Sequence, residues 1–461
     1  MIMKKLKVTT AIVAVTLSGT MALSDGYGPF PVTLKGYSGD KTNTVSYSGQ
    51  IARHVLEQSL KKLAGKGNGG GNAAALEAQM LSYFNGTDED LPIIAPKSKD
   101  GFKIKQTSLH QISKGKNISG KFYNGAMTAW PGNMSGKDVA YNMIAMAAKS
   151  TKGFDADTGY DWAQLISKYT MGAMAYHQAV DNYLDEKLSA EKKPNNKPYK
   201  DGDHYTGKEH SWDEAFGYWG AAAHQHGFNP NKVYEIAKMK NQGAADKNGD
   251  GMVDLKSEYV FGPAYYAAAF DRSGAKSTNY TSTIFDAFLD GRKLITAAAG
   301  NALTDSERSQ LKAYAATIEE NWEKVLAEAV FKYAGSVYKD INKMKDLGGD
   351  DLNKAYRAYA KHWGELKGFA MAMQSGKSNL GATATKMNEL MGFGPVTLNN
   401  SYVTGMDSNG NFVMDRKRSW SDYQLNMLKI QQMMVDTFSV KARVNDGLND
   451  LQALTDKLDS A

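Results

Sequence analysis

The chain has 461 residues, no cysteine and a formal net charge of +6. Because 42% of the residues are apolar and 10% are aromatic, the chain can bury a large core and lacks the composition of a disordered protein. The lack of cysteine excludes disulfides, thiolate metal sites and a lipid attached to an N-terminal cysteine. Helix formers dominate and proline occurs only 10 times, which predicts a mainly α-helical fold with long irregular loops and a few short strands.

Residues 1–24 have the pattern of a secretory signal peptide. Lys4, Lys5 and Lys7 form a basic start, an apolar run begins at Val8, and small residues end the segment at Ala22-Leu23-Ser24. Cleavage would halve the net charge, so nucleic-acid binding has no support. No other stretch is apolar enough to span a bilayer. We therefore expect a periplasmic or secreted protein that does not span the membrane once the leader is removed.

Residues 25–461 are predicted to form one large helical domain, with halves at about 40–240 and 255–461. The polar segment 86–135 is expected to be largely irregular. Apolar periodicity and capping signals predict the helices. These are a helix that begins at Ser48, and helices at about 73–84, 137–149, 160–190, 209–226, 230–240, 280–299, 304–334, 350–375, 419–437 and 444–458.

The stretch Glu209–His226 concentrates histidine, carboxylate and aromatic side chains. Read as one helix, it places an apolar stripe of Trp212, Phe216 and Trp219 beside a polar stripe with small residues between its ends. The polar stripe supplies nitrogen and oxygen atoms suited to iron or zinc. Its ligand candidates are His210, Asp213, Glu214 and His224. The alternative interpretation is a packed helix whose histidine and carboxylate groups satisfy each other.

A second patch lies on the predicted helix 350–375, where His362 and Glu365 are three residues apart and Gly368 follows. His210, Asp213 and Gly217 occur in nearly the same order about 150 residues earlier. This one shared pattern indicates either a duplicated helical bundle or a coincidence, with equal support for each. A shared ligand site would require the two patches to meet in space.

A further motif resembles a calcium loop. Its candidate ligands are Asp246, Asn248, Asp250, Met252 through its carbonyl group, Asp254 and Glu258. The departure is at position twelve, where Ser257 stands and Glu258 follows one residue late. A turn built on Asx side chains without a metal is the alternative. The weaker echo Asp407–Asn411 is interpreted as a hairpin loop around Asn409-Gly410.

Several motifs resemble an uncharacterised family of bacterial envelope proteins, the domain-of-unknown-function family four-eight-five-six. They are Tyr47–Arg53, Met171–Ala179, Glu209–Tyr218, Asp290-Gly291-Arg292 and His362–Phe369. Many members of that family are lipoproteins, but this chain lacks the necessary cysteine. The family is in turn similar to imelysin-type proteins, which are exported, all-helical and associated with iron uptake. Their Gly-x-His-x-x-Glu motif resembles Gly207–Asp213 with altered spacing and an Asp in place of Glu.

These observations favour an exported helical-bundle protein that binds a metal ion or a metal-bearing ligand, with a link to iron acquisition implied by the resemblance alone. Calcium, and iron or zinc, are the expected cofactors. The first alternative is a calcium-stabilised envelope module that recognises a peptide, a glycan or a partner protein without catalysis. The second is a metallohydrolase, although the chain has no His-Glu-x-x-His motif and no Gly-x-Ser-x-Gly nucleophile motif. The sequence nominates no catalytic residue.

Overall fold

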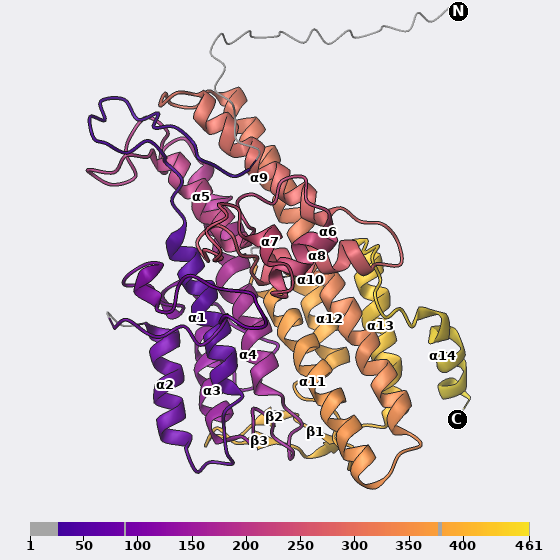
Figure 1. Cartoon of the computed structure of the whole chain (residues 1–461). Helices are drawn as coiled ribbons and strands as arrows, with labels where there is room; N and C mark the ends of the chain where they lie inside the picture. Colours follow the sequence, from indigo (N-terminus) through magenta and orange to yellow (C-terminus); the bar gives the residue numbers. More distant parts are fainter. Residues whose placement is uncertain (1–25, 87–88, 377–379, 461) are drawn as a thin grey trace, which may run out of the picture.

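A computed structural model describes residues 26–86, 89–376 and 380–460; the predicted leader lies outside these residues. The fold is a mainly helical bundle, as predicted (Figure 1). The helices of the N-terminal part lie side by side in purple and magenta. They are α1 (Ser48–Ala64), α2 (Ala73–Asn85), α3 (Gly136–Lys149) and α4 (Trp162–Thr170).

The predicted helix 160–190 is confirmed from Trp162 to Tyr183, but it changes from an α-helix to a π-helix after Thr170 and ends earlier than predicted. The chain continues through two π-helical segments, η3 (Met171–Tyr176) and η4 (Gln178–Tyr183). A π turn holds an extra residue, which the 3.6-residue periodicity of the apolar positions does not report. The widened turns begin where Gly172 lies against Ala372 of the C-terminal part of the chain.

The middle of the chain supplies α5 (Gly207–Trp219), α6 (Pro230–Ala237), α7 (Gln242–Ala245), α8 (Gly262–Ser273) and α9 (Tyr280–Ala297). The C-terminal part supplies α10 (Asp305–Met344), α11 (Gly349–Gln374), α12 (Gly381–Met391), α13 (Trp420–Phe438) and α14 (Leu451–Asp459). The sequence did not predict α8 or α12. The start of α10 was predicted: the Thr304 hydroxyl accepts a hydrogen bond from the Glu307 amide at 3.2 Å.

The segment 86–135 is largely irregular, as predicted, with two short 3-10 turns, η1 (Leu109–Gln111) and η2 (Ser119–Lys121). Further 3-10 turns are η5 (Glu186–Leu188) and η6 (Leu448–Asp450). The strands form two small antiparallel pairs. β1 (Ser401–Tyr402) pairs with β4 (Arg416–Lys417), and β2 (Gly405–Met406) pairs with β3 (Phe412–Val413). The second pair encloses the predicted Asn409-Gly410 hairpin loop, which is thereby confirmed.

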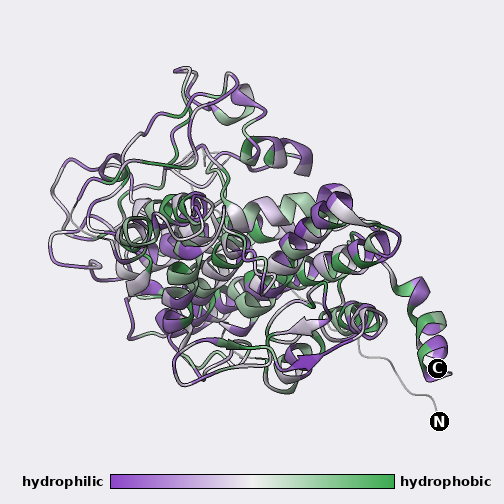
Figure 2. Ribbon diagram, turned by 90° about the horizontal axis from the view of Figure 1, so that it is seen from below, coloured by the Kyte–Doolittle hydropathy of each residue, from purple (hydrophilic) through white to green (hydrophobic). Residues whose placement is uncertain are grey.

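One continuous cluster of buried apolar residues runs from Tyr27 to Ala442. The two parts of the chain meet where α4 packs against α11. Hydrophobic and hydrophilic residues alternate around the helices, which is the pattern of amphipathic helices packed on a shared core (Figure 2). Among the described residues, none of the helices combines the length and apolar character needed to cross a membrane.

Candidate functional site

Helix α5 carries the candidate site, and local capping interactions fix both of its ends. At its start, the Thr206 hydroxyl accepts from the Glu209 amide at 3.1 Å, and the Glu209 carboxylate accepts from the Thr206 amide at 2.8 Å. At its end, Gly220 takes a left-handed conformation with φ of 74°. The prediction of one helix through His226 is therefore wrong, and His224 lies outside α5.

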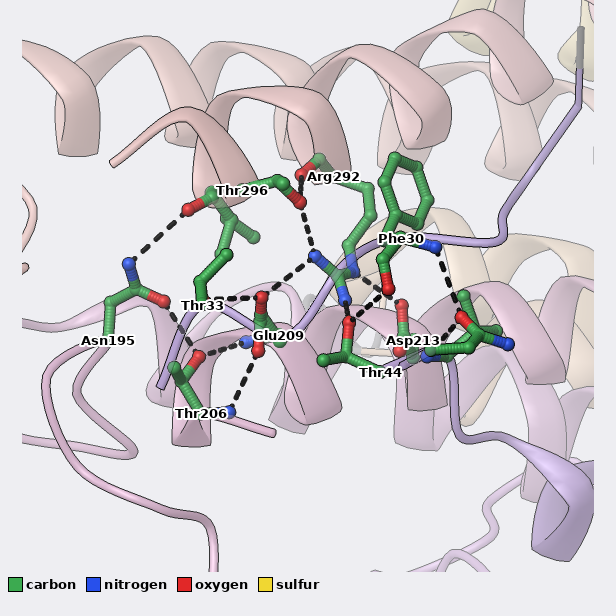
Figure 3. A network of polar contacts seen from close by, with 12 residues as sticks. Phe30, Thr33, Thr44, Asn195, Thr206, Glu209, Asp213, Arg292 and Thr296 are labelled. Carbon is green, nitrogen blue, oxygen red and sulfur yellow. Dashed lines mark hydrogen bonds and ion pairs between the residues drawn. The ribbon is translucent and has the colours of Figure 1, made fainter. Parts of the chain in front are cut away.

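One face of α5 is buried against α9 through the guanidinium of Arg292, whose side chain is fully buried (Figure 3). Its Nε donates to Oδ1 of Asp213 at 2.9 Å, and its Nη1 donates to Oε1 of Glu209 at 3.3 Å. Its Nη2 donates to the hydroxyl of Thr44 at 2.5 Å. The guanidinium thus holds two carboxylates of α5 and a side chain of the N-terminal segment at once.

The N-terminal segment 26–46 completes this network (Figure 3). The Tyr27 hydroxyl donates to Oδ1 of Asp213 at 2.8 Å, and the Ser46 amide donates to Oδ2 at 3.1 Å. The Thr33 hydroxyl donates to Oε1 of Glu209 at 3.0 Å. Burial raises the pKa of Asp213 to about 6, although the positive charge of Arg292 opposes the shift. Asp213 is therefore a packed, hydrogen-bonded structural carboxylate.

The motif Asp290-Gly291-Arg292 allows α9 to approach α5 closely. A Cβ atom at Gly291 would lie 2.1 Å from Cζ2 of Trp212, a distance that the two helices cannot accommodate. The indole nitrogen of Trp212 donates to the carbonyl of Phe288 at 2.8 Å. The predicted apolar stripe of α5 is confirmed, since Trp212, Phe216 and Trp219 are all fully buried.

The other polar face of α5 carries His210 and Glu214, one turn apart. Their Nε2 and Oε1 atoms are separated by 3.8 Å. The His210 ring stacks on Tyr205 with ring centroids 4.6 Å apart and meets the edge of Tyr199 at 4.3 Å. Burial lowers the pKa of His210, so its imidazole is neutral near pH 7. Nδ1 of His210 and Oε2 of Glu214 are buried and have no hydrogen-bond partner within the described structure.

His210 and Glu214 line a cavity of about 430 Å³ that is bounded by α1, α5 and two loops. We call it the His210 pocket. Positive side chains outnumber acidic ones in its lining: the cations are Arg53, Lys116, Lys121 and Lys200, and the carboxylates are Asp203 and Glu214. Burial, followed by the nearby charge of Arg53, lowers the pKa of both Lys116 and Lys121. The pocket therefore has a positive electrostatic character.

The other predicted ligands lie elsewhere. The Nε2 atom of His224 is 2.9 Å from the Ala244 carbonyl, and His224 lines a separate cavity with Glu258. Nδ1 of His362 lies 2.6 Å from Asp340, and Glu365 accepts from the Tyr333 hydroxyl at 3.2 Å. His210 and His362 line two different cavities, and among the described residues no three His, Asp or Glu side chains form a metal-ligand group.

The two helix patches share glycine packing rather than ligand chemistry. A Cβ atom at Gly217 would lie 2.7 Å from Cβ of Tyr47 on the α1 side. The matching atom at Gly368 would lie 2.6 Å from Cβ of Lys168 in α4. Both glycines therefore permit a close helix crossing. The repeated His–acid–Gly order therefore reflects two close helix crossings, at Gly217 and at Gly368. The two histidines, His210 and His362, contact different residues.

The calcium-like loop has an ordered network of backbone hydrogen bonds. Asp246 accepts from the amides of Gly249 and Gly251, each at 2.8 Å. The side-chain oxygen of Asn248 accepts from the Asp250 amide at 2.8 Å, and Asp250 accepts from the Met252 amide at 2.9 Å. These contacts turn the side chains at positions one, three and five toward the inside of the loop.

The later part of the loop is fixed by Val253 and Glu258. The Val253 amide donates to the Lys103 carbonyl at 2.7 Å, so the loop is tied to the irregular segment 86–135. Glu258 is buried despite its late position, and its carboxylate accepts from the amides of Lys247 at 3.0 Å and Asp254 at 2.8 Å. Asp254 also accepts from the Gln106 amide group at 2.7 Å. The predicted ligands thus lie within one loop, and the hydrogen bonds of Glu258 join its two ends.

Comparison with known proteins identifies the family. The family model described as Domain of unknown function (DUF4856) matches residues 36–392. The chain belongs to this family. No curated protein and no solved structure matches the chain. The comparisons show no similarity to imelysin-type proteins, which stays a prediction from the motif Gly207–Asp213.

The DUF4856 match includes the whole lining of the His210 pocket, Arg292 and the calcium-like loop. It excludes α13, α14 and Tyr27. The sequence did not predict most of the residues that line the His210 pocket, because Lys116, Lys121 and Tyr199 come from segments without helical or strand periodicity. The one available signal was Arg53, which ends a motif used to recognise the family.

Proposed function

We propose that this protein is an exported ligand-binding protein whose His210 pocket binds a small polyanion, including a metal ion held in an anionic chelate. The positive lining of the pocket is the observation that carries the proposal. A polyanion would neutralise Arg53, Lys116 and Lys121, which have few carboxylates near them. The aromatic rings of Tyr199 and Tyr205 would form the wall that orients the ligand.

The same electrostatics argue against a bare metal ion as the ligand. His210 and Glu214 offer one nitrogen and one carboxylate, and Asp213 is committed to Arg292. A free cation would also be repelled by four neighbouring positive side chains. An anionic chelate avoids both problems, because it brings most of its own metal ligands. The neutral imidazole of His210, which lines the pocket, could then complete the coordination of the metal.

The proposal predicts that the protein binds citrate and ferric citrate. The double substitution K116M/K121M should lower the affinity for each ligand by at least about tenfold, because each lost ammonium group removes a charge-assisted contact. Isothermal titration calorimetry at low salt measures this effect. Affinity should fall as pH rises, and earlier than for ordinary lysines, because burial lowers the pKa of Lys116 and Lys121. His210→Ala should weaken ferric citrate more than citrate if imidazole coordinates the metal.

The matched control is K66M/K429M, which removes the same charge from exposed lysines outside the pockets. It should bind citrate like the unaltered protein. Equal affinities in the two double variants, or no binding of either ligand, would remove the pocket as an anion site. Hydrolysis of a substrate by the purified protein would instead support the metallohydrolase alternative.

A second candidate function is calcium-dependent stabilisation of an envelope recognition module, and the closed geometry of the loop 246–258 favours it. Asp246, Asn248, Asp250 and Glu258 bring oxygen atoms to this loop, and oxygen ligands suit calcium. In the described structure these oxygens accept backbone hydrogen bonds and do not form a metal-ligand group, so calcium binding would require the side chains to rearrange. Lys105 donates to Asp250 at 3.0 Å, so calcium would compete with an ammonium for that carboxylate. Peptide, glycan or protein recognition would then use the surface that the loop holds in place.

For the loop, addition of about 1 mM CaCl2 to chelator-treated protein should raise its melting temperature by several degrees, since a ligand that binds only the folded state stabilises it. Differential scanning calorimetry measures the shift. Asp246→Asn should abolish it, whereas Asp407→Asn, in a similar Asx turn of the β2–β3 hairpin, should leave it unchanged. A melting temperature indifferent to both calcium and chelator would eliminate this candidate.

A further inference from the structure

A second charged cavity, of about 410 Å³, lies where the N-terminal and C-terminal parts of the bundle meet. We call it the Lys168 pocket. Lys61 of α1 and Lys168 of α4 reach it from adjacent helices, and Tyr266 of α8 and Tyr333 of α10 provide aromatic walls. Its other titratable lining residues are Glu57, Lys62, Lys238, Tyr259, Tyr265, Lys361 and Glu365.

Lys168 is the central residue of this pocket. Its side chain is buried, with 5% of the residue exposed, yet within the described structure its ammonium group makes no ion pair with a carboxylate. It lies 5.3 Å from the ring centroid of Tyr266 and 5.9 Å from that of Phe369. Cation–π contacts offset only part of the cost of burying a charge. The pocket therefore presents a buried cation that, in the described structure, no carboxylate contacts at ion-pair distance, although Glu57 and Glu365 line the same cavity.

The carboxylates of the pocket are already engaged. Glu57 accepts from the Ser167 hydroxyl at 2.8 Å, and Glu365 accepts from the Tyr333 hydroxyl at 3.2 Å. Neither lies in an ion pair with Lys61 or Lys168 in the described chain. Each of these carboxylates accepts its hydrogen bond from a hydroxyl group rather than from an ammonium group.

Electrostatic repulsion between the lysines is strong. The charge of Lys168, followed by burial, lowers the pKa of Lys61 to about 7, although Glu57 and Glu365 oppose the shift. Nearby Lys332 also has a lowered pKa, first from burial and then from repulsion by Lys168 and other lysines. The pocket would therefore gain favourable electrostatic energy from an anion bound in the cavity beside the two ammonium groups.

We propose that the Lys168 pocket is a second ligand site, in which the oxoanion group of a small molecule, a carboxylate or a phosphate, binds beside both Lys61 and Lys168. The remainder of the ligand lies against the rings of Tyr266 and Tyr333. The site is separate from the His210 pocket, because the two cavities share no lining residue.

Proton uptake provides the decisive test. At about pH 8, an unliganded Lys61 is mostly neutral, and an anion bound beside it would raise its pKa and draw a proton from the buffer. Titration calorimetry with inorganic phosphate and with malonate, each in two buffers of different ionisation enthalpy, measures this uptake. It is performed in the K116M/K121M background, so that the His210 pocket does not contribute. The better-bound anion distinguishes a phosphate from a carboxylate ligand.

In that background, we expect uptake of up to about one proton per bound anion. Lys61→Met should abolish the uptake and weaken anion binding at least tenfold; Lys168→Met should weaken binding similarly. Lys66→Met, just beyond α1, should change neither. Circular dichroism and melting temperature establish that each variant is folded. Binding without proton uptake, anion affinity unchanged by Lys61→Met, or no anion binding in the folded background protein would overturn the proposal, and none of these outcomes affects the His210 pocket.

Discussion

Replacing Arg292 with methionine is expected to lower the free energy of unfolding by about 3–5 kcal/mol. Methionine fills much of the same volume but leaves the buried carboxylates of Glu209 and Asp213 without their cation. Urea denaturation followed by circular dichroism at about pH 8 measures the loss. Because α5 carries His210 and Glu214 on its opposite polar face, anion binding in the His210 pocket should weaken as well.

The loss should depend on pH in a defined direction. The folded-state pKa of Asp213 is raised, so this group stabilises the fold when protonated, and that contribution is lost as pH rises through about 6. Without the positive charge of Arg292, the pKa of Asp213 is raised further. The difference in free energy of unfolding between the variant and the unaltered protein should therefore shrink as pH falls from about 8 to about 5. Arg272→Met, at an exposed position in α8, should lower the free energy of unfolding by less than about 1 kcal/mol at any pH between about 5 and about 8. Equal losses in the two variants, independent of pH, would contradict the structural role of the network.

The second large effect is expected from Gly172→Val, with a loss of more than about 3 kcal/mol. A Cβ atom at Gly172 would lie 2.2 Å from Cβ of Ala372 and 2.5 Å from its Cα. Since the second atom belongs to the backbone of α11, rotation of a side chain cannot relieve the contact. The substitution would therefore separate the N-terminal and C-terminal parts of the bundle where they meet, and thermal denaturation would show it.

A double-mutant cycle separates this steric effect from helix propensity. Gly172→Ala combined with Ala372→Gly should recover part of the loss caused by Gly172→Ala alone, because only the Cβ–Cβ contact is removed. Gly243→Ala, in α7, is the control: a Cβ atom there meets nothing within 4 Å, so stability should be unchanged or slightly raised. A well-tolerated Gly172→Val would show that the two helices can move apart.

Local sequence signals predicted the helical class and many element positions. The Thr304 capping box marked the start of α10, because its partner lies three residues away. Gly220 was less informative, since a glycine can lie within a helix or end it. Its left-handed conformation ended α5 before His224, at a place where a Cβ atom would lie 2.8 Å from Cβ of Phe261. A helix end that depends on tertiary packing is not visible in a periodic pattern.

The candidate site was only partly predictable for a related reason. Helical spacing placed His210 with either Asp213 or Glu214, because both lie within one turn. The choice depends on Arg292, which is distant in sequence and binds Asp213 on the inner face. Likewise, the positive charge of the His210 pocket comes from Arg53 of α1 and from lysines of separate loops, and the sequence contains no pattern that joins them.

The Arg292 network also constrains the order in which the chain can fold. The Tyr27–Asp213 and Thr44–Arg292 hydrogen bonds join residues 186 and 248 positions apart. Contacts of such high contact order form slowly, since long loops must close before any gain is realised. A nascent chain released before α9 is synthesised would carry α5 with two uncompensated carboxylates. We therefore expect α5 and the N-terminal segment to acquire protection from hydrogen exchange late in folding, after the local helices α1 and α2 have formed.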